Sequence, residues 1–305
     1  YNISHDSVNR FLEREDYTPH DLYQEAIQHI DNNKLIVSID DTVLDKPYSQ
    51  HMDLVSYFWS GKHHRSVKGI NLITLYATDQ NGQNIPINFR IYDKSEGKTK
   101  NDYFMDMLSE VLSWGAKIQF ITGDSWYSST GNLKTIRKYG IRFMFGIDCN
   151  RKVSPEKGQW FQLRLLPDFH QGQVVWLKNF GFVQLFKTQL KEQQRFYIVH
   201  QDEDDLLSFE GFHELHSSHW KIEQYHRVIK QVCHIAMFQV RRSKLILNHI
   251  FSALMAYVEI QKNQFERIFE NVYRWQKKLF RPVIKNFIDD FILDKNHLLP
   301  QRIYK

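Results

Sequence analysis

Cysteine and the short motifs of the commonest cofactor sites are nearly absent from this chain of 305 residues. Its only cysteines, Cys149 and Cys233, exclude a disulfide framework and suit a reducing cytoplasm. A phosphate-binding loop, a dinucleotide fingerprint and a Cys-x-x-Cys pair are all missing, so the classes that depend on these motifs are excluded. The run His213-Glu214-Leu215-His216 is one residue shorter than His-Glu-x-x-His, and this spacing excludes a zinc protease.

Long hydrophobic runs, internal repeats and low-complexity tracts are also lacking. No apolar segment is long enough to cross a bilayer and no signal peptide is recognisable, so we expect no membrane partner. The chain begins with Tyr1 rather than Met, which leaves room for a segment upstream. The composition does provide a 42% hydrophobic share, enough for a real core, and a formal net charge of +5, which mildly favours a polyanionic partner.

One stretch without Gly or Pro, residues 216–230, has the pattern of a helix. Because positions three or four apart share a helix face, Glu223 lies among four side chains that can donate hydrogen bonds or carry positive charge: His216, His219, Arg227 and Lys230. A lone carboxylate among bases is what a metal site facing phosphate requires. A solvated amphipathic helix with ordinary ion pairs explains the same pattern.

Two further acidic positions follow short apolar runs that predict buried strands. Residues 34–39 are followed by Asp40-Asp41, and residues 117–122 are followed by Gly123 and Asp124. An unpaired carboxylate is costly to bury, so acids at these positions indicate a functional site. Turns also favour Asp, which leaves a purely structural explanation open.

The order of predicted elements indicates a mixed α/β sheet flanked by helices. Residues 46–66 are polar and irregular, and a hairpin signal, Asn81-Gly82, then separates two strand-like runs. A helix over 101–114, the strand at 117–122, a helix over 132–139 and a strand over 141–147 follow.

The remaining segments differ in character from this α/β part. Short strands at 174–177, 181–186 and 195–200 predict an all-β insertion, and a largely apolar helix covers 244–261. The tail beyond it is basic, aromatic and helical, as in segments that follow a phosphate backbone. Residues 2–30 also have a helical pattern, which fits either the remnant of a small DNA-binding domain or a simple helical lead-in.

Three acids, two at strand ends and one on a helix, can converge on a pair of divalent cations. Oxygen ligands suit Mg²⁺, which keeps waters and takes substrate phosphate. Two such ions can activate an attacking hydroxyl and stabilise the leaving oxygen.

This order of motifs resembles the DDE transposases of bacterial insertion sequences, in the cut-and-paste group that has a β-strand insertion in a ribonuclease H-like fold. The resemblance runs from about Leu35 to Gln261. Three segments carry it: Ile39-Asp40-Asp41-Thr42, Ile121-Thr122-Gly123-Asp124-Ser125-Trp126-Tyr127, and Trp220-Lys221-Ile222-Glu223 with Lys230. The group often has Tyr and Arg at the positions of His216 and His219, which puts phosphate gripping by Arg in question, because His is only partly charged at neutral pH.

The resemblance implies catalytic and metal-binding roles for Asp40, Asp124 and Glu223, with Asp41 as the alternative to Asp40. It implies DNA contacts for His216, His219, Arg227 and Lys230, and either base stacking or local packing for Trp126. The implied architecture is a ribonuclease H-like mixed sheet in two parts, 34–149 and 209–262, with a β-rich insertion at 150–208. A helical N-terminal segment, 1–33, and a basic helical tail, 263–305, complete it.

The implied activity is cleavage of transposon ends and transfer of the freed 3′ hydroxyl into target DNA. It requires Mg²⁺, with Mn²⁺ as a substitute, and the implied partners are double-stranded DNA and a second copy of the chain on paired ends. The implied location is the bacterial cytoplasm, in association with the nucleoid. Two alternatives stay open: a catalytically inactive DNA-binding remnant, and a structure-selective nuclease on the same fold.

Overall fold

A computed structural model describes residues 4–61, 63–156, 158–190, 193–200, 205–278, 281–282 and 285–286. The chain divides into two compact units, residues 1–258 and 259–305. The described part of the second unit contains the end of helix α6 (Ser243–Phe265) and a helical segment at 272–278. The predicted tail beyond residue 286 lies outside the described residues.

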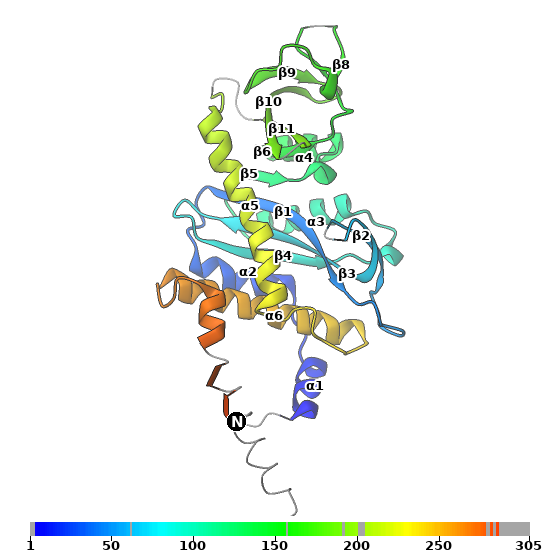
Figure 1. The fold of residues 1–305 in the computed structure, drawn as a ribbon, viewed down its shortest axis with the longest axis vertical. Helices are drawn as coiled ribbons and strands as arrows, with labels where there is room; N and C mark the ends of the chain where they lie inside the picture. The colour runs from blue at the N-terminus through cyan, green and yellow to red at the C-terminus, as the bar shows by residue number, and fades with distance from the viewer. Residues whose placement is uncertain are drawn as a thin grey trace, which may run out of the picture. The chain divides into compact units, whose positions relative to one another are not determined.

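One mixed sheet of eleven strands forms the centre of the first unit (Figure 1). Antiparallel pairs join β4 to β3 and β3 to β1, and parallel pairs join β1 to β5 and β5 to β6. This confirms the predicted mixed sheet and is compatible with a ribonuclease H-like fold. The bounds of these strands are Leu35–Asp45 (β1), Arg65–Thr78 (β3), Asn84–Ile91 (β4), Ile118–Gly123 (β5) and Arg142–Ile147 (β6).

Helices flank the sheet and begin at the caps that their sequences provide. Thr18 and Asp21 form a capping box at α2, with Pro19 in the first turn, and α2 packs against β4. Thr99 and Asp102 do the same for α3. The helices are α1 (His5–Arg14), α2 (Pro19–Ala26), α3 (Lys100–Ser113), α4 (Thr130–Lys138), α5 (Phe209–Gln231) and α6, with short 3₁₀ turns η1 (Ile27–His29), η2 (Lys94–Glu96), η3 (Ser125–Tyr127) and η4 (Leu163–Leu165).

The β-rich segment continues the central sheet, because β11 pairs antiparallel with β6. Without this partner β6 would be a bare sheet edge, an exposed template for unwanted pairing. Beyond β6 the strands follow in the order β11, β10, β9, β7, β8. The limits 150–208, which the sequence gives for the insertion, stay a prediction. Their bounds are Lys152–Ser154 (β7), Phe161–Gln162 (β8), Gln173–Leu177 (β9), Gly181–Leu190 (β10) and Gln193–His200 (β11).

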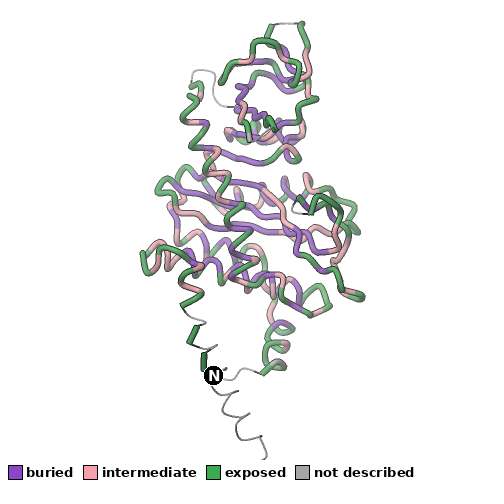
Figure 2. Tube along the Cα trace, viewed as in Figure 1, coloured by how far each residue is buried: buried purple, intermediate pink, exposed green. Residues whose placement is uncertain are grey.

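The hydrophobic core runs from the central strands into the β-rich segment, and the buried parts of the sheet stand out in Figure 2. Helix α5 contributes to both parts. Its first turns bring Phe212 and Leu215 into a cluster with residues of β5, β6, β10 and β11. Further along, Tyr225 stacks on Tyr76 of β3, with ring centroids 4.8 Å apart. One continuous helix is therefore fixed at two places, with Glu223 between them.

Candidate active site

The first two acids lie within β1, whereas the sequence predicts a strand that ends at residue 39. Asp40 and Asp41 remain paired with β3, but the parallel pairing of β1 with β5 ends at Ile39 and Gly123. Tertiary pairing thus overrides the weak strand preference of Asp. Both carboxylates lie where the parallel partner strand stops.

Asp40 and Asp41 point to opposite faces of the sheet, because side chains alternate along a strand. Asp40 faces α5, where its Oδ2 lies 3.5 Å from Nδ1 of His226. Asp41 faces α3 and η3, and both of its oxygens are occupied. They accept hydrogen bonds from Lys100 Nζ (2.7 Å), Asn71 Nδ2 (2.6 Å) and the Tyr127 hydroxyl (3.0 Å).

Asp124 follows β5 directly and caps the turn η3, where its Oδ1 accepts a hydrogen bond from the backbone N–H of Trp126 (2.9 Å). Two glycines allow the close approach of this turn to the neighbouring strands. A Cβ at Gly123 would lie 2.6 Å from the ring of Phe145, and one at Gly146 would lie 3.0 Å from the backbone nitrogen of Ser125. The position of Asp124 therefore depends on the absence of side chains at both glycines.

Electrostatics link the predicted carboxylates to one another. Burial raises the pKa of Asp40 well above its usual value, and the negative charges of Asp41, Asp124 and Glu223 raise it further. Burial, followed by the charge of Asp41, raises the pKa of Asp124 to about 6, whereas Lys100 acts in the opposite direction. Acids that are remote in sequence, on β1, after β5 and on α5, thus influence one another in the folded chain.

The predicted carboxylates have the chemistry of ligands for a divalent cation, although they do not form a closed cluster in this structure. Within the described residues, no three His, Cys, Asp or Glu side chains form a ready-made metal site. Asp40, Asp124 and Glu223 nevertheless offer carboxylate oxygens, the ligands that Mg²⁺ prefers. Burial first, and then the charges of neighbouring carboxylates, raise the pKa of Asp40, and a bound cation would favour the ionised form.

A family model described as the transposase DDE domain matches residues 31–258. The chain belongs to the DDE transposase family. No curated protein matches the sequence. No helix among the described residues of this transposase-family chain is long and apolar enough to cross a membrane.

Three solved structures show low similarity to this DDE transposase chain. The Drosophila P element transposase strand transfer complex has 14% identity and a TM-score of 0.26, over 46% of this chain and 30% of that one. Argonaute of Marinitoga piezophila with a 5′ OH guide RNA and target DNA has 9% identity and a TM-score of 0.25, over 75% and 30%. The same Argonaute with guide RNA alone has 12% identity and a TM-score of 0.24, over 63% and 26%. The chain spans about a third or less of the length of each of these structures.

The basic stripe predicted on α5 carries less charge in this transposase chain than its sequence implies. Burial lowers the pKa of His219 to about 4 and also lowers the pKa of His216, so both rings are neutral near pH 7. They hydrogen-bond within the protein, His219 Nδ1 to Thr122 Oγ1 (3.1 Å) and His216 Nε2 to the Tyr197 hydroxyl (3.0 Å). DNA contact by these two histidines stays a prediction, but a cationic grip on phosphate does not fit their pKa values.

The cations of the stripe lie further along the helix. Lys230 Nζ donates a hydrogen bond to Thr42 Oγ1 (2.6 Å), two residues beyond Asp40 on the same face of β1. Arg227 is exposed to solvent. Positive charge on α5 is therefore concentrated on the C-terminal side of Glu223.

Two residues beside the transposase carboxylates were not predicted as site residues. His226, three residues after Glu223, has its Nδ1 3.5 Å from Oδ2 of Asp40, and its Nε2 is buried without a partner among the described residues. The helical spacing of three and four residues fits both His226 and Arg227, and the sequence pattern alone favours Arg227 because it always carries a charge. Lys100 pairs with Asp41 from the first turn of α3, a contact that only the fold reveals.

Trp126 is 62% exposed, so its ring is not part of the buried core. Lys100 Nζ lies 5.6 Å from the centre of its ring, which is a cation–π distance. The ring remains open to a partner outside the chain, and base stacking stays a prediction.

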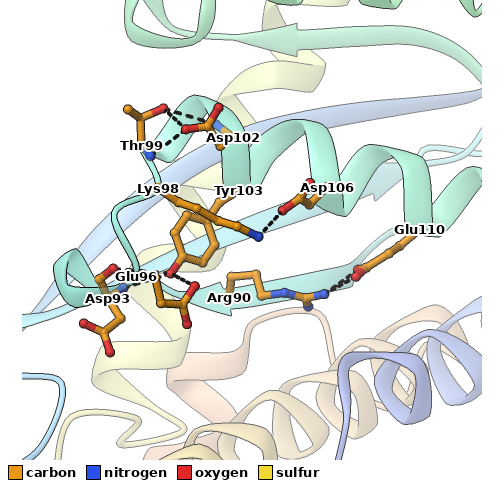
Figure 3. Close-up of polar contacts among 9 residues, drawn as sticks. All are labelled: Arg90, Asp93, Glu96, Lys98, Thr99, Asp102, Tyr103, Asp106 and Glu110. Atoms are coloured by element: carbon orange, nitrogen blue, oxygen red, sulfur yellow. Dashed lines mark hydrogen bonds and ion pairs between the residues drawn. The ribbon is translucent and has the colours of Figure 1, made fainter.

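A framework of polar contacts holds α3 and therefore Lys100 (Figure 3). The Thr99 side chain and Asp102 cap each other, and Lys98 pairs with Asp106 at 2.8 Å. Arg90 of β4 pairs with Glu110 of α3. Side chains of this framework also line a pocket. None of the four site carboxylates lines this pocket, and the lysines and the arginine in its lining are ion-paired. We therefore assign the pocket no role in the site.

Proposed function

We propose that this chain is a metal-dependent DDE transposase whose Asp40, Asp124 and Glu223 bind divalent cations, with Mg²⁺ as the resident ion and Mn²⁺ as a substitute. Two observations support the proposal: the parallel pairing of β1 with β5 ends at Ile39 and Gly123, one residue before Asp40 and Asp124, and α5, which carries Glu223, packs against β1. When bound, such ions lower the pKa of an attacking hydroxyl and stabilise the oxygen that leaves phosphorus. The reactions are cleavage of transposon ends and transfer of the 3′ hydroxyl into target DNA.

Asp40 is the better candidate than Asp41 for the first ligand. It faces α5, the helix that carries Glu223, whereas Asp41 faces the opposite side of the sheet. The oxygens of Asp41 already accept three hydrogen bonds from side chains, including that of Lys100. We assign Asp41 a positioning role: it holds Lys100 and Tyr127 beneath the site.

Several groups of the chain would bind and orient DNA at this site. Lys230, anchored on Thr42, and the exposed Arg227 would contact phosphates next to Glu223. Trp126 would stack on a base displaced near the cut. The proposed partners are double-stranded terminal repeats and target DNA, bound by a homodimer in the bacterial cytoplasm. The strand order β4-β3-β1-β5-β6 supports a ribonuclease H-like core, with β7–β11 as its insertion.

The test uses three substitutions, Asp40→Asn, Asp124→Asn and Glu223→Gln, on duplex DNA that carries the element's own ends. Each should reduce Mg²⁺-dependent end cleavage to background and leave DNA binding in place, because each removes one charged ligand and little volume. Asp41→Asn is the matched control and should retain measurable cleavage.

Cleavage at the wild-type rate in any of the three variants would contradict that residue's role. A wild-type chain that binds the ends and never cuts them, at any Mg²⁺ or Mn²⁺ concentration, would favour an inactive remnant. Cleavage without strand transfer would favour a nuclease.

A further inference from the structure

A two-stranded ribbon extends the sheet beyond the carboxyl end of β1. It consists of β2 (Ser56–Ser60) and the first residues of β3, paired antiparallel from Ser56 and Gly69 to Ser60 and Arg65 (Figure 1). Gly69 is also the last β3 residue that pairs with β1, opposite Asp45. The ribbon therefore begins where β1 ends, five residues after Asp40.

The strand register places two aromatic side chains of the ribbon on the same sheet face as Asp40. Residues directly opposite each other in antiparallel strands share a face, and every second residue along a strand does too. Asp40 is opposite Thr74, and steps of two along β3 lead to Lys68, which is opposite Tyr57. Trp59, two residues after Tyr57, shares this face with them.

These two rings are exposed, and the ribbon does not need them for its own packing. Tyr57 is 63% exposed and Trp59 is 66% exposed. The ribbon is instead anchored through Phe58, which points to the other face, is buried and packs on Tyr92 with ring centroids 5.8 Å apart. Lys94 Nζ fixes the same strand by donating a hydrogen bond to the carbonyl of Tyr57 (2.7 Å).

The charge of the ribbon is of one sign. No Asp or Glu occurs between residues 54 and 78, whereas Arg65 and Lys68 lie within the paired strands. The carboxylate that contacts the ribbon is Asp45 of β1, whose Oδ2 lies 3.2 Å from His63 Nε2. Exposed aromatic rings on a segment that carries basic residues and no acid of its own match the chemistry of a nucleic-acid strand, in which flat bases alternate with phosphates.

We propose that the Tyr57–Trp59 face of this ribbon binds an unpaired DNA strand on the sheet face that Asp40 shares. Side chains two positions apart on a strand are separated by about 7 Å, roughly twice the 3.4 Å rise of stacked bases, so the two rings suit bases that no longer stack on each other. Lys68, which shares their face, would contact a phosphate of that strand. The inference extends the proposed function, because it supplies a binding surface for the strand released when an end is opened.

The experiment measures binding by fluorescence anisotropy with two labelled probes: a blunt duplex, and the same duplex with a single-stranded dT tail. Trp59→Ala and Tyr57→Ala should each weaken binding of the tailed probe by about 10-fold or more, because one stacking contact is lost. The blunt probe should bind as tightly as it does to the wild type. Trp59→Phe, which keeps a ring, should restore most of the difference.

Trp176→Ala is the matched control, since Trp176 is also an exposed strand tryptophan, at 43%, but lies on β9. It should leave both probes unaffected. Equal losses on blunt and tailed probes, or no loss with either alanine variant, would overturn the inference. Should Trp59→Ala fail to fold, as judged by circular dichroism, the decision rests on Tyr57→Ala and Trp59→Phe.

Mg²⁺-dependent cleavage by the wild type, measured in parallel, separates this inference from the proposed function. Cleavage without a tail-specific effect on binding would contradict the inference about the ribbon and leave the proposed function intact. A tail-specific effect in a chain that never cleaves would sink the proposed function and leave the ribbon as a DNA-binding surface.

Discussion

At the scale of single residues, the site shows how neighbours in sequence acquire opposite roles. Asp40 and Asp41 project from opposite faces of β1, so Asp40 lies beside His226 of α5 whereas Asp41 pairs with Lys100 of α3. Two of the histidines of α5, His216 and His219, also show the effect of their surroundings. Both lie on the predicted stripe, but burial lowers the pKa of each ring, so neither carries the positive charge that a phosphate ligand needs.

The half-buried His219 leads to a prediction about acid stability. Its pKa is lowered to about 4 in the folded chain, against about 6.5 for a free histidine. Between these values the unfolded chain binds a proton that the folded chain does not, so this residue makes stability fall as pH falls. His219→Gln, which can keep the hydrogen bond to Thr122, should therefore lose less stability on acidification, by about 1–2 kcal/mol between pH 7 and 5.

Urea denaturation at several pH values measures this difference. His213→Gln, which replaces an exposed histidine of the same helix, is the control and should follow the wild type. If the free energy of unfolding changed with pH in the same way for His219→Gln and the wild type, folding would not lower the pKa of His219 and the prediction would be wrong.

At the scale of elements, local patterns were informative and long-range pairings were not. The apolar runs at 34–39 and 117–122 predicted β1 and β5, because short apolar runs rich in β-branched residues favour buried strands. The strand β2 was missed: it lies in a stretch with too little apolar patterning, and its strand form depends on pairing with β3. Neither the join between β6 and β11 nor the contact of Lys100 with Asp41 has a local signal, since each joins segments about 50 or more residues apart.

The turn that carries Asp124 allows a prediction about position rather than chemistry. A Cβ at Gly146 would lie 3.0 Å from the backbone of Ser125, which cannot rotate away as a side chain can. Gly146→Ala should shift the turn and with it the Asp124 carboxylate. Because misplacement by a fraction of an ångström weakens catalysis, we expect 10- to 100-fold slower end cleavage with DNA binding retained.

Gly131→Ala provides the matched control for this glycine. Its Cβ would meet only the side chain of Ser129, at 3.9 Å, and it lies on α4, where alanine is favoured. Cleavage by Gly146→Ala at the rate of Gly131→Ala would show that the turn accommodates the extra methyl group and that Asp124 does not depend on it.

At the scale of the whole molecule, the question is whether the β-rich segment folds with the central sheet. The sheet is continuous through β6 and β11, and α5 contributes Phe212 to a core shared with β5, β6, β10 and β11. Phe212 stacks on Phe186 of β10, with ring centroids 4.4 Å apart and the planes nearly parallel. These contacts make the segment part of one cooperative structure rather than a separate module.

Phe212→Ala tests this cooperativity. Removal of a fully buried ring should destabilise the protein by about 3–5 kcal/mol, and we expect one unfolding transition that far-UV circular dichroism and tryptophan fluorescence report at the same denaturant concentration. Phe209→Ala is the control: the Phe209 ring is 44% exposed one turn earlier, and its loss should lower stability by less than about 1 kcal/mol. If the β-rich segment were independent, Phe212→Ala would split the transition in two, with the tryptophans of the segment responding first and the central sheet remaining folded. Because the same helix carries Glu223, a single transition would also mean that the proposed catalytic glutamate is held in place by packing on both sides of it.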